Sequence, residues 1–207
     1  MIVDNQISHE PELYLDLVVF NADGTQKYTY YGRSESFVYN WILAQYNASA
    51  NLTTTTGIDT NGVARALNAE GRGFYCYDYP ITTDTPPLGT TTWGIVAGTG
   101  SAPVAFSNYQ LSGLLTHGTG SSQLVYKPMW FDGATASGSI SYDYINRQVS
   151  NMSLAPITVT EVGLIISSTK QAVPAYHWLG VRDLLSTPIT LGLQEALLIK
   201  YTYLVSV

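Results

Sequence analysis

The chain has 207 residues, a formal net charge of −6 and only 12% charged residues beside 45% hydrophobic ones. Soluble domains usually contain about 25% charged residues, so much of this surface must consist of Ser, Thr, Asn, Gly and Tyr side chains. The nine Lys and Arg residues form no run, which argues against direct nucleic acid binding because phosphate neutralisation needs clustered basic residues.

The N-terminal sequence MIVDNQISHEPELYLDL lacks a basic segment followed by an apolar one, and no stretch approaches 18 apolar residues. We therefore expect a soluble chain made in the cytoplasm, with no membrane partner. The single cysteine, Cys76, permits no internal disulfide and no structural zinc site. An uncharged, tyrosine-rich surface suits large contacts with other subunits or with sugars.

The N-terminal part begins with a predicted hairpin, in which strands Leu13 to Phe20 and Gln26 to Tyr31 flank the turn Asn21-Ala-Asp-Gly24. The segment TTDTPPLGTTT at 82–92 is the best linker candidate. We accordingly divide the chain into an N-terminal hairpin, helix and connector (1–92), packed on the same domain, and a β-sandwich core (93–207).

Residues 34–46, SESFVYNWILAQY, form the one convincing helix, with Ser34 as candidate N-cap. Its apolar residues spread almost right round the axis, which is typical of a buried helix. Such a helix lies either under a sheet or under a neighbouring subunit. Because one domain surface covers only one side, we expect the chain to cover Phe37 and Trp41, and a second subunit to cover Tyr39 and Leu43.

The segment GRGFYCYDYP at 71–80 alternates in the manner of a strand and places Tyr75, Tyr77 and Tyr79 on one face. Such a tyrosine ladder packs against a sheet or serves as an aromatic binding platform. Packing is the favoured interpretation.

The C-terminal part contains several further short strands separated by Gly, Pro and Ser turns. Two of them carry breaks, an edge or bulge at Pro128 and a kink at Gly180, and the last two are expected to pair as a hairpin around the turn 192–195. Together they predict an all-β, antiparallel β-sandwich or jelly roll with one short N-terminal helix. The expected strands are 93–97, 123–131, 139–144, 157–166, 176–185, 188–191 and 197–207.

The most strand-like run is ITVTEVGLII at 157–166, and it is expected to be central. Ile157 and Val159 share one face, whereas Val162 and Leu164 share the opposite one. A bulge near Thr160 would bring both pairs into one core. The alternative is a strand that is buried on both faces.

No candidate for catalysis or metal binding stands out. The tetrapeptide Gly-Thr-Gly-Ser occurs at 98–101 and at 118–121, but neither copy completes a phosphate-binding motif, so both are predicted to be surface turns. The three histidines have no metal-ligand spacing, and no serine lies in a nucleophile elbow. Two acidic pairs, Glu10 with Glu12 and Asp59 with Glu70, could be considered as a glycosidase dyad, but the sequence does not give the distance between their carboxyl groups. We expect no enzyme activity, no cofactor and no metal.

Several short motifs taken together resemble a recurrent family of tailed-bacteriophage virion proteins. In chain order they are SFVYNW (36–41), WGIVAGTG (93–100), NYQL (108–111), GSSQLVY (120–126), ITVTEVGL (157–164), VRDLL (181–185) and PITL (188–191). The resemblance covers most of residues 30–207, but the sequence departs from the family pattern in the link at 172–176. It implies a β-sandwich component of the particle, found among head, collar and tail-fibre-like proteins.

Two functions agree with these observations. The first is a virion structural protein that assembles symmetrically with copies of itself and with other virion proteins. The second is a carbohydrate-recognition module of a phage fibre that binds host surface glycan. In that case Tyr75, Tyr77, Tyr79 and Trp130 would stack on sugar rings. A polysaccharide depolymerase would need carboxylates in a cleft, and the sequence identifies none.

Overall fold

Two sheets pack face to face in the computed structural model, which describes residues 12–34, 36–50, 55–67, 88–132, 135–137, 140–168 and 176–206. The larger sheet has the strand order β2(Gln26–Ser34), β1(Glu12–Phe20), β12(Ala196–Ser206), β9(Ile140–Ser150), β7(Gln123–Phe131) and β6(Thr116–His117), with β8(Thr135–Ser137) also on β9. The smaller sheet has the order β11(Tyr176–Leu191), β10(Ile157–Ser168) and β5(Gly94–Gly98).

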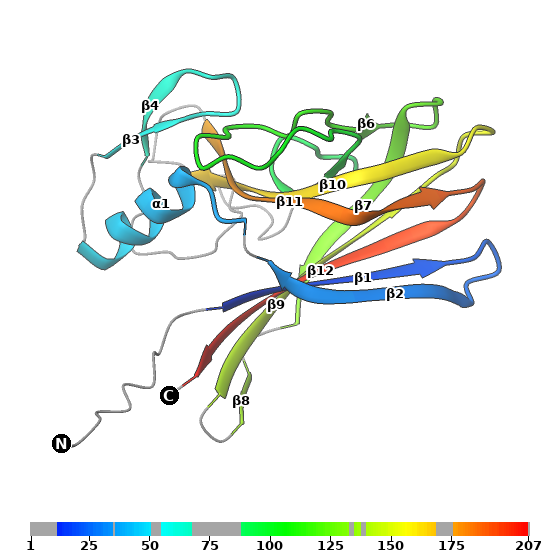
Figure 1. Cartoon of the computed structure of the whole chain (residues 1–207), viewed down its shortest axis with the longest axis horizontal. Coiled ribbons are helices and arrows are strands. Elements are labelled where there is room, and N and C mark those ends of the chain that lie inside the picture. Colours follow the sequence, from blue (N-terminus) through cyan, green and yellow to red (C-terminus); the bar gives the residue numbers. More distant parts are fainter. Residues whose placement is uncertain are drawn as a thin grey trace.

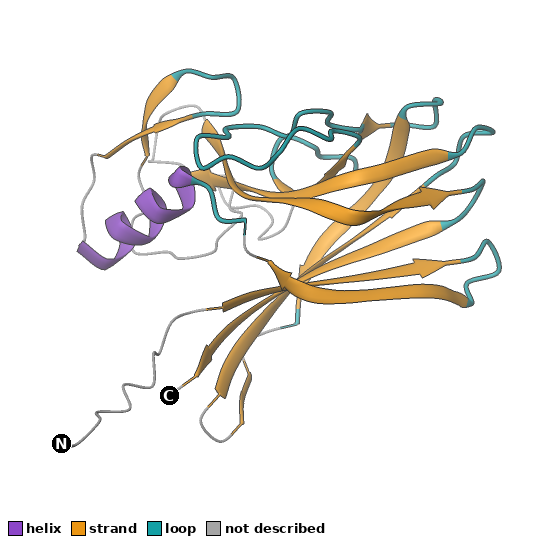
Figure 2. Cartoon of the chain, viewed as in Figure 1, coloured by secondary structure: helices purple, strands orange, loops and turns teal. Residues whose placement is uncertain are grey.

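The helix α1(Tyr39–Ala50) and the hairpin of β3(Thr55–Ile58) and β4(Ala64–Leu67) lie together at one end of the two sheets (Figures 1 and 2). All pairings between described strands are antiparallel except the short pairing of β6 with β7. The predicted all-β sandwich with one short helix is confirmed.

The main core lies between the two sheets. In β1 and β12 every second side chain points inward, which is the pattern expected of antiparallel strands with one buried face. The smaller sheet covers this apolar layer with side chains from β5, β10 and β11. The inward residues of the larger sheet include Leu13, Leu15, Leu17, Val19, Leu197, Ile199 and Tyr201.

The central position of β10 and its bulge are both confirmed. Val159 pairs with Ile189 whereas Glu161 pairs with Leu184, so Thr160 lies at an interruption of the ladder. Val162 therefore enters the same core as Val159, and both are fully buried. Beyond the bulge the other face of β10 is buried too. The alternative prediction, a strand that is buried on both faces, therefore also holds for residues 161–166.

Two more irregularities lie where the sequence predicts them. The pairing of β7 with β9 shifts between Tyr126 and Met129, at Pro128. The pairing of β10 with β11 shifts at Gly180, which is skipped between Leu179 and Val181. By contrast, β9 continues to Ser150, well past the predicted end at 144. The polar residues Asn146 and Arg147 are both buried there, so this part of the strand lacks the apolar and polar alternation that would mark it in the sequence.

The predicted C-terminal hairpin is wrong. The turn at 192–195 carries the chain from β11 in the smaller sheet to β12 in the larger one, where β12 pairs with β1 and β9. The alternation of apolar and polar side chains identifies β11 and β12 as strands, but it does not show which strands they pair with. The turn is held instead by Asn151, the residue that follows β9. The Asn151 N–H donates to the Glu195 carbonyl (3.0 Å), and the Gln194 N–H donates to the Asn151 carbonyl (2.7 Å).

The helix begins at Tyr39 and not at Ser34. Ser34 ends β2, where its hydroxyl donates to the buried Asp183 carboxyl (2.9 Å), so it is not available as an N-cap. The chain then runs along the edge of β11, with the Val38 N–H donating to the Gly180 carbonyl (3.1 Å). These tertiary hydrogen bonds replace the first predicted helical turn.

Candidate functional site

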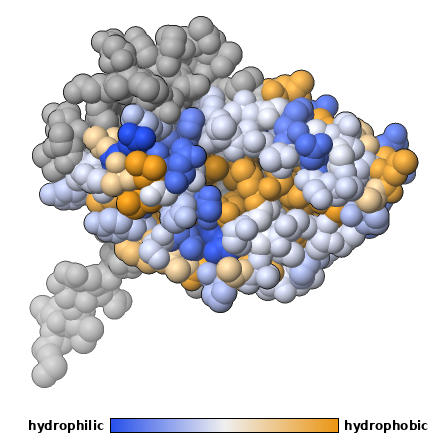
Figure 3. Space-filling view, turned by 90° about the horizontal axis from the view of Figure 1, so that it is seen from above, coloured by the Kyte–Doolittle hydropathy of each residue, from blue (hydrophilic) through white to orange (hydrophobic). Residues whose placement is uncertain are grey.

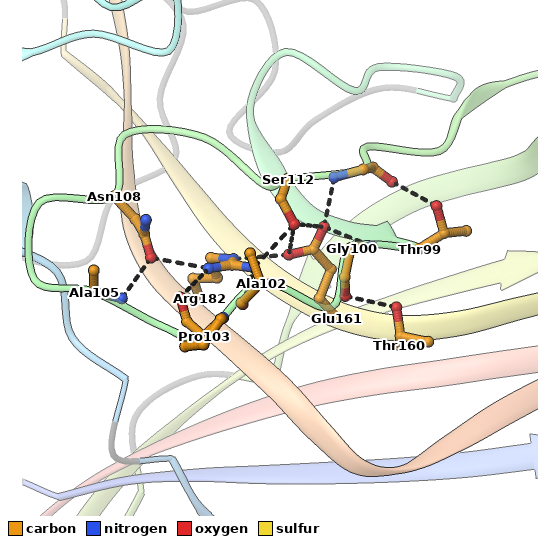
Figure 4. Close-up of polar contacts among 11 residues, drawn as sticks. Thr99, Gly100, Ala102, Pro103, Ala105, Asn108, Ser112, Thr160, Glu161 and Arg182 are labelled. Atoms are coloured by element: carbon orange, nitrogen blue, oxygen red, sulfur yellow. Dashed lines mark hydrogen bonds and ion pairs between the residues drawn. The ribbon is translucent and has the colours of Figure 1, made fainter.

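A large buried polar cluster joins β10 and β11 to the long loop 99–115. Glu161 of β10 and Arg182 of β11 are almost completely buried, and their side chains form an ion pair with an Nε to Oε2 distance of 2.7 Å. Figure 4 shows the two side chains lying beneath the loop. A buried pair of this kind is retained only if its remaining polar atoms also find partners.

The guanidinium group of Arg182 meets this condition. Besides Nε, its four remaining N–H groups donate to acceptors of the loop at 2.8–3.2 Å. Two of these acceptors are the Asn108 amide oxygen and the Ser112 hydroxyl, and the other two are the carbonyls of Ala102 and Pro103 (Figure 4). With all five donors used, Arg182 holds the loop on the sheet and has no donor left for a ligand.

The carboxylate of Glu161 lies in a pocket of backbone amides. The N–H groups of Gly113 and Gly100 donate to its Oε1 atom at 2.7 and 3.1 Å. The first Gly-Thr-Gly-Ser copy therefore binds an anion, but that anion is the chain's own carboxylate, so the prediction of a simple surface turn is wrong for this copy. The second copy is an exposed turn, as expected, closed by the Gly120 N–H on the Gln123 amide oxygen (3.0 Å).

The loop also reaches α1. The carbonyl of Phe106 accepts the N–H of Tyr39 (2.9 Å), one of the helix donors that has no acceptor within the helix. Four of the seven short motifs quoted in the sequence analysis thus meet at one place, since they contribute Gly100, Asn108, Glu161 and Arg182. In this chain these four residues attach the loop to the sheet.

A second buried cluster connects the two sheets through Asp183. Its carboxyl accepts hydrogen bonds from the hydroxyls of Tyr201 (2.8 Å) and Ser34 (2.9 Å), so that β11, β12 and β2 are tied together. Burial raises the pKa of Asp183, although the hydrogen bonds from Tyr201, Ser34 and Ser36 act in the opposite direction. Burial also raises the pKa of Tyr201 well above its usual range, and the neighbouring Asp183 carboxyl adds to the effect.

A pH dependence of stability follows from the raised pKa of Asp183. A carboxyl that binds its proton more tightly in the folded chain than in the unfolded chain, where the pKa is about 3.9, favours folding at low pH. This contribution is complete below the unfolded pKa and is lost as the pH rises through the raised folded pKa. Each unit of pKa difference corresponds to about 1.4 kcal/mol.

The variant Asp183→Asn cannot titrate at this position, so it isolates the effect. We expect the free energy of unfolding of the unmodified chain, relative to that of Asp183→Asn, to increase as the pH falls from 7 towards 4. Urea unfolding curves of both proteins at several pH values provide the measurement. A difference that stays constant over this range would contradict the assignment.

The histidines and acidic residues of the described ranges form no metal-ligand cluster. No group of three or more His, Cys, Asp or Glu side chains is placed to hold a metal ion in the described ranges. His117 accepts the Tyr126 N–H through Nδ1 (3.2 Å), and His177 is half-buried in β11. His9, Glu10 and Glu70 lie outside the described residues. The described part of the chain also contains no helix long and apolar enough to cross a lipid bilayer.

The interface residues predicted on the helix divide differently from expectation. Phe37 precedes α1 and is half-buried, with its ring stacked on Trp41 at 5.3 Å. Trp41 is buried as expected, but Leu43 is buried with it in the chain's own second apolar cluster, so its assignment to a partner subunit is wrong. Two sides of the helix are covered, one by β11 and another by the β3–β4 hairpin. Hydrogen bonds between the Asn40 amide and the Ile58 backbone hold the hairpin against the helix.

The exposed side of α1 carries Tyr39, Ile42 and Tyr46. Next to them lies Phe106 of the loop, whose ring centroid is 5.4 Å from that of Tyr39. Exposed fractions of 47%, 47%, 56% and 57% show that these four residues, here named the α1 strip, are accessible together. Phe106 lies in a loop whose sequence shows neither helical nor strand periodicity. Its place in this surface therefore could not be predicted from the sequence.

The predicted sugar platform is described only in part. Tyr75, Tyr77 and Tyr79 lie outside the described residues, while Trp130 is exposed on the larger sheet. The face seen in Figure 3 is largely pale, the colour of residues of intermediate hydropathy, with an orange apolar patch near its centre and several separate blue hydrophilic patches. The chain matches no protein family, and comparison with curated proteins and with solved structures gave no match.

Proposed function

We propose that this chain is a structural component of a tailed-bacteriophage virion, as a head decoration, collar or tail-associated protein, and that it works through symmetric subunit assembly. The observation that carries the proposal is the α1 strip. The buried polar clusters support it, because their charged groups are used to hold loops and sheets in place, as a structural protein requires. The phage-like motifs support it as well, since several of them supply one of these clusters.

The α1 strip has the composition of a protein contact. Tyr39, Ile42 and Tyr46 are three and four positions apart, so they lie along one helix face. No residue of α1 is charged, and the neighbouring aromatic Phe106 widens the strip beyond the helix. Protein interfaces are depleted of charge at their centre and enriched in aromatic residues, which matches this surface.

Symmetry multiplies the effect of such a surface. In a closed ring or two-fold assembly each subunit uses the same strip, so one substitution changes every equivalent interface. The few hot-spot residues near the centre of an interface contribute about 2 kcal/mol or more each, which is roughly a thirtyfold change in the dissociation constant.

Sedimentation velocity over a range of protein concentrations tests the proposal. The unmodified chain is expected to form a defined oligomer, and Ile42→Glu and Tyr46→Ser are expected to be folded but to dissociate at least thirtyfold more readily. Leu154→Glu is the control, because Leu154 is 93% exposed and belongs to a different surface. An unmodified chain that stays monomeric, or strip variants that assemble as well as the control, would overturn the proposal.

The location on a virion needs its own measurement. Mass spectrometry of purified phage particles should detect this chain in a fixed ratio to the major head or tail protein, and antibody labelling should place it on the particle. Its absence from purified particles would refute the virion assignment while leaving self-assembly untouched.

A further inference from the structure

We propose that the outer face of the larger sheet binds a neutral, extended polysaccharide along one row of side chains that crosses five strands. This inference is independent of the α1 strip. It rests on the register of β2, β1, β12, β9 and β7, which lie in this order in the sheet (Figure 1).

The register places one residue from each of these strands in line. Asp16 pairs with Tyr31 on one side and with Lys200 on the other, and Asn146 pairs with Lys200 and with Trp130. Residues that pair directly in a sheet share a face. The face is the outer one, because the neighbours of these residues along β1, β12 and β9 point into the core. The row is Tyr31, Asp16, Lys200, Asn146 and Trp130.

Aromatic rings lie at both ends of the row. Tyr31 is 65% exposed, and its ring stacks on that of Tyr14 at 5.5 Å with only 6° between the planes, which orients the Tyr31 ring and leaves its other face for a ligand. Trp130 is 39% exposed. With strands about 4.8 Å apart, the two ends lie about 19 Å from each other, a span that exceeds a disaccharide and suits a chain of several sugars. Flat, apolar ring faces beside polar groups are what stacking on a pyranose requires.

The middle of the row is polar and its charges are paired. The Lys200 ammonium lies 3.4 Å from the Asp16 carboxylate and 4.0 Å from the centre of the Tyr144 ring. Asn146 itself is only 2% exposed, and its amide donates to the Asp132 carboxylate (2.8 Å), so the exposed Asp132 supplies the polar surface at this point of the row. An anionic polymer would meet Asp16 and Asp132 as closely as it meets Lys200, so like charges would oppose its binding. Uncharged hydroxyl groups can use the same donors and acceptors without that cost.

The test uses soluble neutral hexasaccharides, namely cellohexaose, maltohexaose and xylohexaose, titrated by isothermal calorimetry, with heparin hexasaccharide as the anionic comparison. At least one neutral hexasaccharide is expected to bind, and its disaccharide at least tenfold more weakly. Trp130→Ala and Tyr31→Ala are expected to weaken binding at least tenfold, while Trp130→Phe, which keeps a flat ring, retains most of it.

Tyr28→Ala is the matched control. Tyr28 lies on the same strand as Tyr31 and is 43% exposed, but it pairs with the inward-facing Val19 and therefore belongs to the opposite face. Its loss should leave the affinity unchanged. Ile42→Glu in the α1 strip should also bind normally, because each oligosaccharide occupies one subunit whatever the assembly state. The proposal is overturned if no neutral hexasaccharide binds, if heparin binds better, or if Tyr28→Ala weakens binding as much as Tyr31→Ala.

Discussion

Replacing Arg182 with methionine is expected to lower the free energy of unfolding by about 3–5 kcal/mol, because the substitution leaves a charged partner buried and unpaired. The Glu161 carboxylate would keep the N–H groups of Gly100 and Gly113 but lose its ion pair with Arg182. The loop 99–115 would lose four further hydrogen bonds at the same time. Chemical denaturation at neutral pH measures the change.

A double-variant cycle separates the ion pair from the rest of the cluster. Glu161→Leu combined with Arg182→Met removes both charges, and apolar replacement of a complete buried pair is often far less costly than removal of one partner. We expect the double variant to be more stable than Arg182→Met alone. If its destabilisation instead equals the sum of the two single changes, the two side chains are not coupled as the 2.7 Å contact implies.

The second large effect is expected from a carboxylate placed in the core at Val162 or Leu164. Both side chains are fully buried between the sheets on the central strand β10. Val162→Asp and Leu164→Asp should each cost about 4 kcal/mol or more, enough to prevent folding of a domain of ordinary stability. Circular dichroism and expression in the soluble fraction report the loss.

Thr158→Asp provides the comparison for these two variants. Thr158 lies on the same strand before the bulge, where its hydroxyl makes an exposed contact with Thr190 (2.9 Å). An aspartate there stays accessible to water, so we expect a change below about 1 kcal/mol. Stability of Val162→Asp or Leu164→Asp equal to that of Thr158→Asp would disprove the burial of the inward face beyond the bulge.

The fold was predictable where side-chain periodicity and turn chemistry act locally. The bounds of β7 agree with those predicted, and Gly24 turns the first hairpin with a φ of 83°, as the Asp23-Gly24 pair indicates. The start of α1 was not predictable in this way. Ser34 has the residue type of an N-cap, but its hydroxyl binds Asp183, which lies 149 positions away in the chain. No local pattern contains that information.

The buried ion pair does have a signal in the sequence. Glu161 interrupts the most strand-like run of the chain, and Arg182 follows an apolar segment, although only 12% of the residues are charged. A charge inside a buried strand requires an opposite charge close by. What remained unpredictable is the loop that satisfies the pair, since its four acceptors are carbonyls, an amide and a hydroxyl of a type found throughout the sequence. The burial of Leu43 was unpredictable for a similar reason. The geometry of a helix shows which residues share a side, but it does not show how many of those sides the rest of the chain covers.

The position of β12 affects how the chain can fold during its synthesis. This strand follows all other described strands in sequence, yet it lies inside the larger sheet between β1 and β9. Until it leaves the ribosome, the inner edges of β1 and β9 have no partner, and the apolar face of the β1–β2 hairpin lacks its neighbour. The sheet therefore closes only after translation of β12, through contacts between residues nearly the whole chain apart. In the interval the open edges are exposed to pairing with other nascent chains.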